Sequence, residues 1–330
     1  MWAVMVLAAL AFVGRFGPRV PLWDDYDVIP VLTGAQPLTG AWLWSLHNEH
    51  RVPLPRLVLL AAYRLAGCDF RAGMVVNVVA LGTVALGLIA AARARREGTR
   101  YADAVFPLVL LHEGHHANLL WSWQVQFILS TALAGVILLL IVRRGTRPGP
   151  GAGIAIGTCL VLLPLCGANG LALVPAPALW ILGISVAEAR SGARRACRNA
   201  LLIVVPTVVA LAVTGLYLSG FRGTRHHPAA PGVVPSLATA LQFLGLGLGP
   251  AGAFLWPGSG LAILVLVLLS ATRLVRVWVR SPEERARASG LLAFLGAMGA
   301  LALGLGWGRA GSGELAGLAD RYVTLAAPTL

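Results

Sequence analysis

The sequence predicts an all-α fold, a polytopic bundle of about nine transmembrane helices that forms one membrane-embedded domain over residues 1–330. Composition is the first reason, because 58% of the residues are hydrophobic, only 12% are charged, and the mean hydropathy is +0.79. The second reason is that apolar runs recur along the whole chain, separated by short connections that carry Arg. These values exclude an ordinary soluble domain, since roughly 20 consecutive apolar residues cross a bilayer.

The apolar runs give the expected order of the helices. A first helix is expected at 1–13, and a long outer loop follows at 15–71. Within this loop, residues 52–66 are apolar but interrupted by Pro53 and Pro55, which predicts an amphipathic helix lying in the membrane interface. Further spans are expected at 72–92, 102–112, 121–142, 153–167, 169–187, 199–219, 260–279 and 288–307.

Two stretches do not fit this simple alternation. Residues 232–258 are rich in Gly and Pro, which is compatible with a re-entrant segment, an interfacial segment or a further span. The final stretch, 321–330, resembles the beginning of another inward span. We therefore expect a truncated chain whose C-terminus is incomplete.

The distribution of Arg predicts the orientation of the bundle. The sequence contains no Lys, and its formal net charge is +13. Four alternate connections are basic, at 93–100, 143–147, 190–198 and 273–287, and together they hold 16 of the 26 Arg residues. By the positive-inside rule these connections face the cytoplasm and its anionic membrane lipids. The net charge is thus a topology signal, and nucleic-acid binding is not needed to explain it.

The outer loop contains two dense polar groups. Asp24, Asp25 and Asp27 place three carboxylates within four residues, and the run His47-Asn48-Glu49-His50-Arg51 follows. Charge at this density is costly beside a bilayer and usually marks function there. Adjacent carboxylates repel each other, so one pKa is expected to rise, and such a group acts as a general base or holds a divalent cation.

The acidic pair and the layout of the spans resemble GT-C glycosyltransferases, a group that includes protein mannosyltransferases, aminoarabinose transferases and oligosaccharyltransferases. In these enzymes an Asp-Asp pair follows the first span. The stretches Trp23-Asp24-Asp25-Tyr26 and 47–56 are also similar to bacterial membrane proteins of this broad group. The resemblance implies a multi-pass protein of the bacterial inner (plasma) membrane. It also implies transfer of a sugar from a polyprenyl-phosphate donor to an unknown acceptor on the extracytoplasmic face.

The resemblance also implies roles for particular residues. Asp24 or Asp25 would act as the catalytic base or as a ligand of a divalent cation such as Mg²⁺ or Mn²⁺. Arg51 and Arg321 would grip the lipid phosphate, because a guanidinium pairs well with phosphate oxygens. Further residues expected to bind substrate or to line the pocket are Asp27, His47, Glu49, His50, His115, His116, Gln124 and Tyr322.

A second hypothesis is a membrane zinc metalloprotease. The stretch 112–116 fits the H-E-x-x-H motif, in which His112 and His116 would bind zinc while Glu113 activates water. Against it, Gly114 weakens a helix there, and the motif falls at a predicted turn. No third ligand is obvious, although Glu188, Asp320, His226 and His227 remain open.

A third hypothesis is a lipid or solute transporter without catalysis. A transporter would place ionisable residues near the middle of the membrane. The expected spans contain almost none there.

Overall fold

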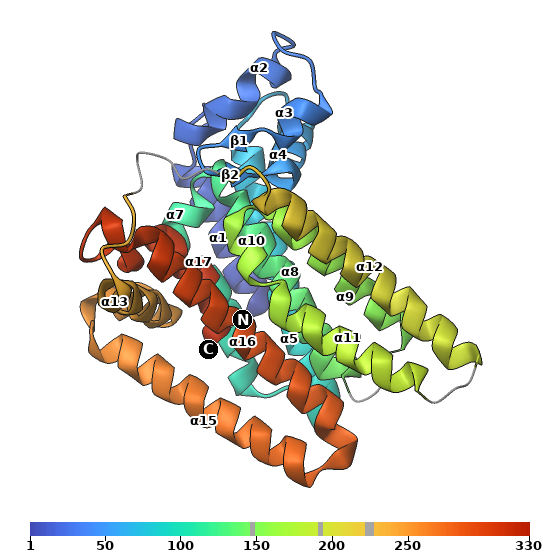
Figure 1. Ribbon diagram of the computed structural model, residues 1–330. Helices are drawn as coiled ribbons and strands as arrows, with labels where there is room; N and C mark the ends of the chain where they lie inside the picture. Colours follow the sequence, from blue (N-terminus) through green and yellow to red (C-terminus); the bar gives the residue numbers. More distant parts are fainter. Residues whose placement is uncertain (146–148, 191–193, 222–227) are drawn as a thin grey trace.

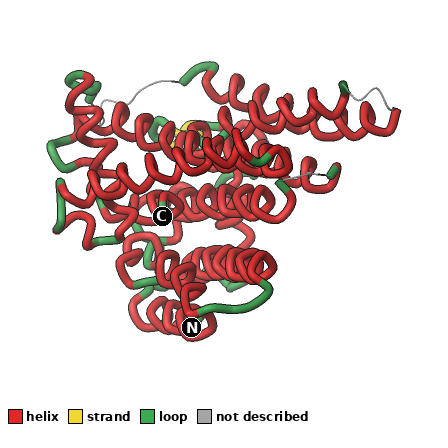
Figure 2. Tube along the Cα trace, turned by 90° about the horizontal axis from the view of Figure 1, so that it is seen from below, coloured by secondary structure: helices red, strands yellow, loops and turns green. Residues whose placement is uncertain are grey.

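The computed structural model describes residues 1–145, 149–190, 194–221 and 228–330. Over this part of the chain the fold is helical apart from one short hairpin (Figure 1; Figure 2). The hairpin pairs β1 (Leu46–His47) with β2 (His50–Arg51), so that His47 lies opposite His50. The longer helices are α1 (Trp2–Phe16), α4 (Pro53–Leu65), α5 (Arg71–Arg96), α8 (Val125–Arg144), α9 (Pro150–Leu162), α11 (Pro175–Ala189), α12 (Arg194–Leu218), α13 (Val233–Gly245), α15 (Gly258–Arg280) and α16 (Arg285–Arg309).

Shorter elements connect these helices. The short α-helices are α2 (Ile29–Leu32), α3 (Gly40–Trp44), α6 (Val105–Leu111), α7 (His116–Leu119), α10 (Ala168–Ala172), α14 (Ala251–Phe254) and α17 (Val323–Ala326). Three 3₁₀ turns matter for the site, namely η1 (Trp23–Val28), η3 (Glu113–His115) and η4 (Ser122–Gln124).

Five helical segments are long and apolar enough to cross a membrane. They are Arg71–Arg96, Ser122–Arg144, Cys197–Leu218, Gly258–Arg280 and Pro282–Ser312. A helix of about 20 residues reaches roughly 30 Å, the thickness of the hydrocarbon core. The outward face of α15 is apolar, and Leu261, Val265 and Leu268 are each more than half exposed. The expected helical membrane fold is therefore confirmed, and the chain is a multi-pass membrane protein.

Several expected boundaries differ from the structure. The span expected at 102–112 is not a continuous helix, because its α-helix, α6, has only seven residues and is about 10 Å long. The span expected at 169–187 is divided into α10 and α11, with the break just before Pro175, whose ring disfavours a continuing helix. Residues 232–258 form α13 and α14, and a helix, α4, forms where an interfacial helix was expected at 52–66.

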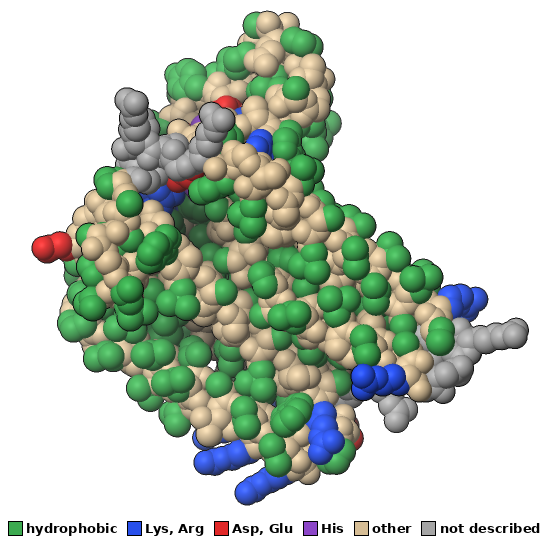
Figure 3. Space-filling model, viewed as in Figure 1, with side chains coloured by type: hydrophobic (Ala, Val, Ile, Leu, Met, Phe, Trp, Pro, Cys, Tyr) green, Lys and Arg blue, Asp and Glu red, His purple; other side chains and the backbone are tan. Residues whose placement is uncertain are grey.

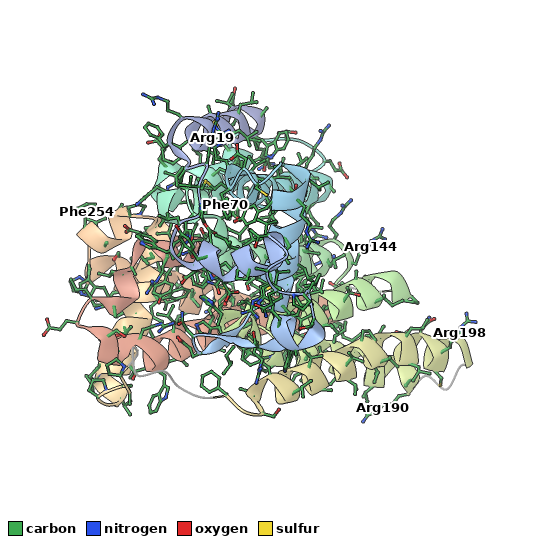
Figure 4. All side chains as sticks on the ribbon, turned by 90° about the horizontal axis from the view of Figure 1, so that it is seen from above. Arg19, Phe70, Arg144, Arg190, Arg198 and Phe254 are labelled. Atoms are coloured by element: carbon green, nitrogen blue, oxygen red, sulfur yellow. The ribbon has the colours of Figure 1, made fainter. Side chains whose placement is uncertain are left out.

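Basic residues gather at one end of the bundle. In Figure 1 the turns after α11 and α15 lie at the end opposite to α2, α3 and the hairpin. Figure 3 shows blue side chains at that end. Figure 4 shows Arg144, Arg190 and Arg198 projecting from one side of the molecule, away from Arg19. Arg147 lies outside the described residues. The outer loop thus lies away from the basic end.

The first loop rests on a hydrophobic cluster of its own. Val28, Val52, Leu59 and Trp123 are each at most 1% exposed in this cluster, which joins η1 and α4 to the start of α8. A glycine permits the close approach of α5 to η4, since a Cβ atom at Gly73 would lie 2.6 Å from the Cβ atom of Ser122. In Figure 4 the neighbouring Phe70 lies in the interior of this region. The cluster positions the polar side chains that point away from it.

Candidate functional site

The three carboxylates of the acidic turn η1 lie in different environments. Asp25 is 0% exposed. Its Oδ2 atom accepts a hydrogen bond from the backbone N–H of Leu22 at 3.1 Å, and its Oδ1 atom accepts one from the hydroxyl of Tyr63 at 3.2 Å. Burial outweighs these bonds and raises the pKa of Asp25 to about 6. Asp25 therefore caps the turn from inside and does not face an open space.

Asp27 holds the turn to the rest of the loop. It accepts a hydrogen bond from Nε of Arg56 at 2.8 Å, and the Arg56 side chain is only 1% exposed. The same guanidinium donates to the carbonyl oxygens of Trp42 and Ser45 and lies over the Trp42 ring. Burial opposes the charge of Asp27, but hydrogen bonds from His47 and Arg56 lower its pKa. Asp27 and Arg56 thus form a paired, hydrogen-bonded tether.

Asp24 is the most exposed carboxylate of the three, with 35% of its side chain accessible. One oxygen lies 3.3 Å from Nε2 of His47, whose Nδ1 lies 3.3 Å from Asp27. The His47 ring packs on Trp123, with 4.6 Å between ring centroids. Burial alone would lower the pKa of His47, but the two carboxylates raise it to about 9. His47 is therefore an imidazolium at neutral pH, held between Asp24 and Asp27.

Asp24 and His47 open into a pocket with about 480 Å³ of empty space, part of it open to solvent. Four parts of the chain build it: the first loop, the start of α8, the end of α16 and the segment before α17. The lining residues are Asp24, His47, Asn48, Glu49, His50, Trp121, Trp123, Gln124, Gln126, Phe127, Arg309, Arg321 and Tyr322. The pocket thus brings together seven of the residues expected from the sequence, although they lie at opposite ends of the chain.

Cations and an anion meet on one wall of this pocket. Nη2 of Arg309 donates to Oε1 of Glu49 at 2.8 Å, and Nε2 of His50 lies 3.2 Å from the same oxygen. Burial opposes the charge of Glu49, yet His50 and Arg309 hold its pKa well below the usual range. Arg321 lies nearby, with its guanidinium carbon 5.3 Å from the centre of the Tyr322 ring. This wall is suited to an anionic group.

The pocket walls also contain buried polar atoms without a partner. Among the described residues nine buried side-chain atoms lack a hydrogen bond, and five of them belong to residues that line this pocket. Four are of interest for a ligand: Nδ1 of His50, Nε1 of Trp123, Oε1 of Gln124 and the hydroxyl of Tyr322. Each such group costs about 1–3 kcal/mol when it is left unpaired. Their concentration here indicates a place where a polar molecule supplies the missing bonds.

Some residues expected in the site lie elsewhere. Arg51 braces the hairpin, since its backbone N–H donates to the hydroxyl of Tyr217 at 3.1 Å and its guanidinium lies over the ring of Trp44. His116 lies 3.6 Å from Asp320 at a half-exposed position. Neither Arg51 nor His116 lines the pocket.

His115 is buried in a network that holds the last segment of the chain. Its Nδ1 lies 2.7 Å from Oγ1 of Thr324, and its Nε2 lies 2.8 Å from the carbonyl oxygen of Val109. Asn118 donates to the same Thr324 oxygen and to the carbonyl of Arg321. Since the Thr324 hydroxyl accepts from Asn118, it donates to His115, and His115 donates to Val109 through Nε2. Burial lowers the pKa of His115 to about 3, so the ring is neutral.

The zinc motif does not form the required ligand arrangement. His112 is extended, residues 113–115 form η3, and α7 begins only at His116, so the two His are not one α-helical turn apart. Nδ1 of His112 accepts from the N–H of Gly114 at 3.0 Å. Glu188 is near Asn199, and His226 and His227 lie outside the described residues. In the described part of the chain no three His, Cys, Asp or Glu side chains come together as a metal site.

A metal held jointly by Asp24 and Asp25 also fits the geometry poorly. Both oxygens of Asp25 are engaged by Leu22 and Tyr63 inside the turn. Asp24 alone faces the pocket, with the cationic His47 as its neighbour. We therefore derive no step through a metal.

The sequence reasoning missed several lining residues, chiefly Arg309, Trp121, Trp123 and Phe127. Arg309 had a usable signal, because it comes directly after the span expected at 288–307. The aromatic residues had no separate signal, since Trp is enriched at both membrane interfaces for other reasons.

The functional assignment rests on the geometry of this pocket, because comparisons with known proteins found no match. No protein-family model matches the chain, and no curated protein or solved structure is similar to it at a significant level.

Proposed function

We propose that this protein is a membrane glycosyltransferase of the GT-C type that transfers a sugar from a polyprenyl-phosphate donor to an acceptor hydroxyl. The basic end of the bundle would face the cytoplasm. The pocket would then open on the extracytoplasmic side of a bacterial inner membrane, where membrane lipids deliver the donor. The acceptor is left unassigned.

One observation carries the proposal. Asp24 from the first loop and Arg321 from the last segment line the same pocket, together with Arg309, Gln124 and Tyr322. Glycosyl transfer from a phosphate donor needs a carboxylate that accepts a proton and guanidinium groups that bind the leaving phosphate.

The roles follow from exposure and charge. The Asp24 carboxylate takes the proton of the acceptor hydroxyl, and the acceptor oxygen forms a bond to the anomeric carbon of the sugar. The bond from that carbon to the phosphate oxygen breaks, and the polyprenyl phosphate leaves with the electron pair. Arg321 stabilises the negative charge on the leaving group. His47 orients Asp24, because its Nε2 atom lies 3.3 Å from a carboxylate oxygen of Asp24.

Native mass spectrometry of the detergent-purified protein tests donor binding. We expect a polyprenyl phosphate to co-purify with the wild-type chain and with Arg51→Gln. It should be lost from Arg321→Gln, since Arg321 lines the pocket and Arg51 does not. Equal retention by the two variants, or one bound zinc that is lost in His112→Ala, would contradict the proposal. Uptake of a solute without any sugar transfer would favour the transporter hypothesis instead.

A further inference from the structure

The wall of the pocket next to α16 is formed by the turn of the hairpin. The turn residues are Asn48, whose φ is 52°, and Glu49, and both line the pocket. The tip is fastened to the end of α16 by the ion pair between Glu49 and Arg309. At its base the hairpin is fastened separately, because the backbone N–H of Arg51 donates to the hydroxyl of Tyr217 on α12. The tip and the base of the hairpin are thus held by different helices, α16 and α12.

Glu49 occupies a position that suits the anionic end of a ligand. Its carboxylate oxygen accepts from Arg309 at 2.8 Å and lies 3.2 Å from Nε2 of His50. A phosphate oxygen would accept from Arg309 in the same way, because Arg pairs with phosphate as well as it pairs with carboxylate. Exchanging one anion for another leaves the charge beside Arg309 balanced, so the exchange avoids the cost of an unpaired buried cation.

The buried polar atoms without a partner indicate which hydrogen-bonding groups the ligand carries besides its phosphate. The Trp123 indole can only donate, the Gln124 carbonyl oxygen can only accept, and the Tyr322 hydroxyl can do both. Each of these three side chains is at most 3% exposed, and each of the three polar atoms lacks a partner among the described residues. Hydroxyl groups meet all three requirements, because each hydroxyl both donates and accepts. The rings of Trp121 and Trp123 add apolar surface for the ring of a sugar.

We propose that the pocket is a self-occupied binding site for a sugar phosphate, in which Glu49 holds the phosphate position on Arg309 until the ligand displaces it. The hydroxyls of the ligand then bond to Trp123, Gln124 and Tyr322. The assignment of the phosphate to a polyprenyl lipid rests on the proposed function, whereas the exchange at Arg309 does not. Glu49 is accordingly a competitor of the ligand, and Arg309 is a phosphate-binding residue.

Binding of defined probes to the purified protein in nanodiscs tests the exchange. The probes are inorganic phosphate, glucose 1-phosphate and undecaprenyl phosphate, and tryptophan fluorescence and calorimetry report their affinities. Glu49→Gln should bind every probe about fivefold more tightly, since the site is no longer self-occupied. Arg309→Gln should bind about tenfold more weakly. Asp69→Asn, which removes a charge from an ion pair with Arg71 outside the pocket, is the matched control and should change nothing.

A double variant separates competition from a general effect on folding. If Glu49 acts only by occupying Arg309, Glu49→Gln gives no gain in an Arg309→Gln background. Tyr322→Phe should weaken glucose 1-phosphate and leave inorganic phosphate unchanged, because only the sugar has hydroxyls for that position. An unchanged or lowered affinity of Glu49→Gln would overturn the proposal, and so would a gain that survives without Arg309.

Hydrogen exchange on the wild-type protein gives a test without any substitution. Glucose 1-phosphate should increase exchange in a peptide covering residues 46–51, because it releases the hairpin tip. Unchanged or slower exchange in a saturated sample would overturn the displacement. If glucose 1-phosphate and inorganic phosphate bind as described but undecaprenyl phosphate does not, the exchange at Arg309 stands and the lipid-donor assignment fails.

Discussion

Asp24 and Asp25 are adjacent in the sequence, yet their carboxylates face opposite sides of one turn. Asp24 lies in the pocket beside His47, while Asp25 is fully buried and bonded to Leu22 and Tyr63. A 3₁₀ turn has about three residues per turn, so neighbouring side chains point roughly 120° apart. The two aspartates therefore have different roles, one in the site and one beneath it.

This division predicts that Asp25→Asn stabilises the protein at pH 7.5. The folded pKa of Asp25, about 6, is above its ordinary value, so its ionisation costs stability as pH rises through that range. The amide avoids this cost, and the Tyr63 hydroxyl can turn to accept from it. We expect a gain of about 1–3 kcal/mol at pH 7.5 that shrinks at pH 5. Thermal unfolding in detergent measures it, and a loss of stability at pH 7.5 would contradict the assigned role.

The imidazolium of His47 predicts a second pH dependence with the opposite sign. Its folded pKa, about 9, is above the ordinary value near 6.5. The contribution of His47 to the free energy of unfolding is therefore complete below pH 6.5 and is lost as pH rises through 9. The upper limit is on the order of 3 kcal/mol. We expect the melting temperature of wild type to fall between pH 7 and 10 by more than that of His47→Gln, and parallel curves would contradict the ion pairs with Asp24 and Asp27.

The buried Arg56 predicts a large effect on the first loop. Arg56→Met removes one of the two charge partners of Asp27 and the donor to the carbonyl oxygens of Trp42 and Ser45, which costs about 3 kcal/mol, at the lower end for a buried pair because His47 still faces Asp27. Chemical unfolding followed by tryptophan fluorescence measures this loss. Arg64→Met on the exposed face of the same helix is the control, and it should change stability by less than about 0.5 kcal/mol. Similar losses in the two variants would contradict the tether.

The network around Thr324 predicts a change in binding as well as in stability. Thr324→Val removes the hydroxyl that accepts from Asn118 and contacts His115, which costs about 1–3 kcal/mol. Because Asn118 also holds the carbonyl of Arg321, the donor KM should rise while kcat changes little. Thr324→Ser, which keeps the hydroxyl, should restore the KM. A Thr324→Ser variant as impaired as Thr324→Val would contradict this positioning role.

Much of the fold could be predicted from the sequence, because long apolar helices have a strong compositional signal. The limits of α5 and α15 lie close to the expected spans, and α4 appears where Pro53 and Pro55 indicated an interfacial helix. The segment expected as a span at 102–112 is interrupted in the structure, because hydropathy measures how apolar a run is and does not show where a helix breaks.

The site was harder to predict than the fold. Local density of charge pointed correctly to Asp24 and Glu49 as residues that share a pocket. The different roles of Asp24 and Asp25 depend on the direction of each side chain in η1. A run of neighbouring Asp residues in the sequence does not show these directions. Arg309 depends on a long-range contact between the hairpin tip and α16, and a single sequence contains no direct signal of such a contact.

The most direct test of the account is sugar transfer by the purified protein in proteoliposomes. The protein is given polyprenyl-phosphate-linked sugar donors and a panel of acceptor lipids and glycans, and products are detected by mass spectrometry. We expect Asp24→Asn to abolish transfer while Asp25→Asn keeps most of it, because only Asp24 faces the pocket. Full transfer by Asp24→Asn, or loss of transfer in Asp25→Asn alone, would contradict the proposed active site.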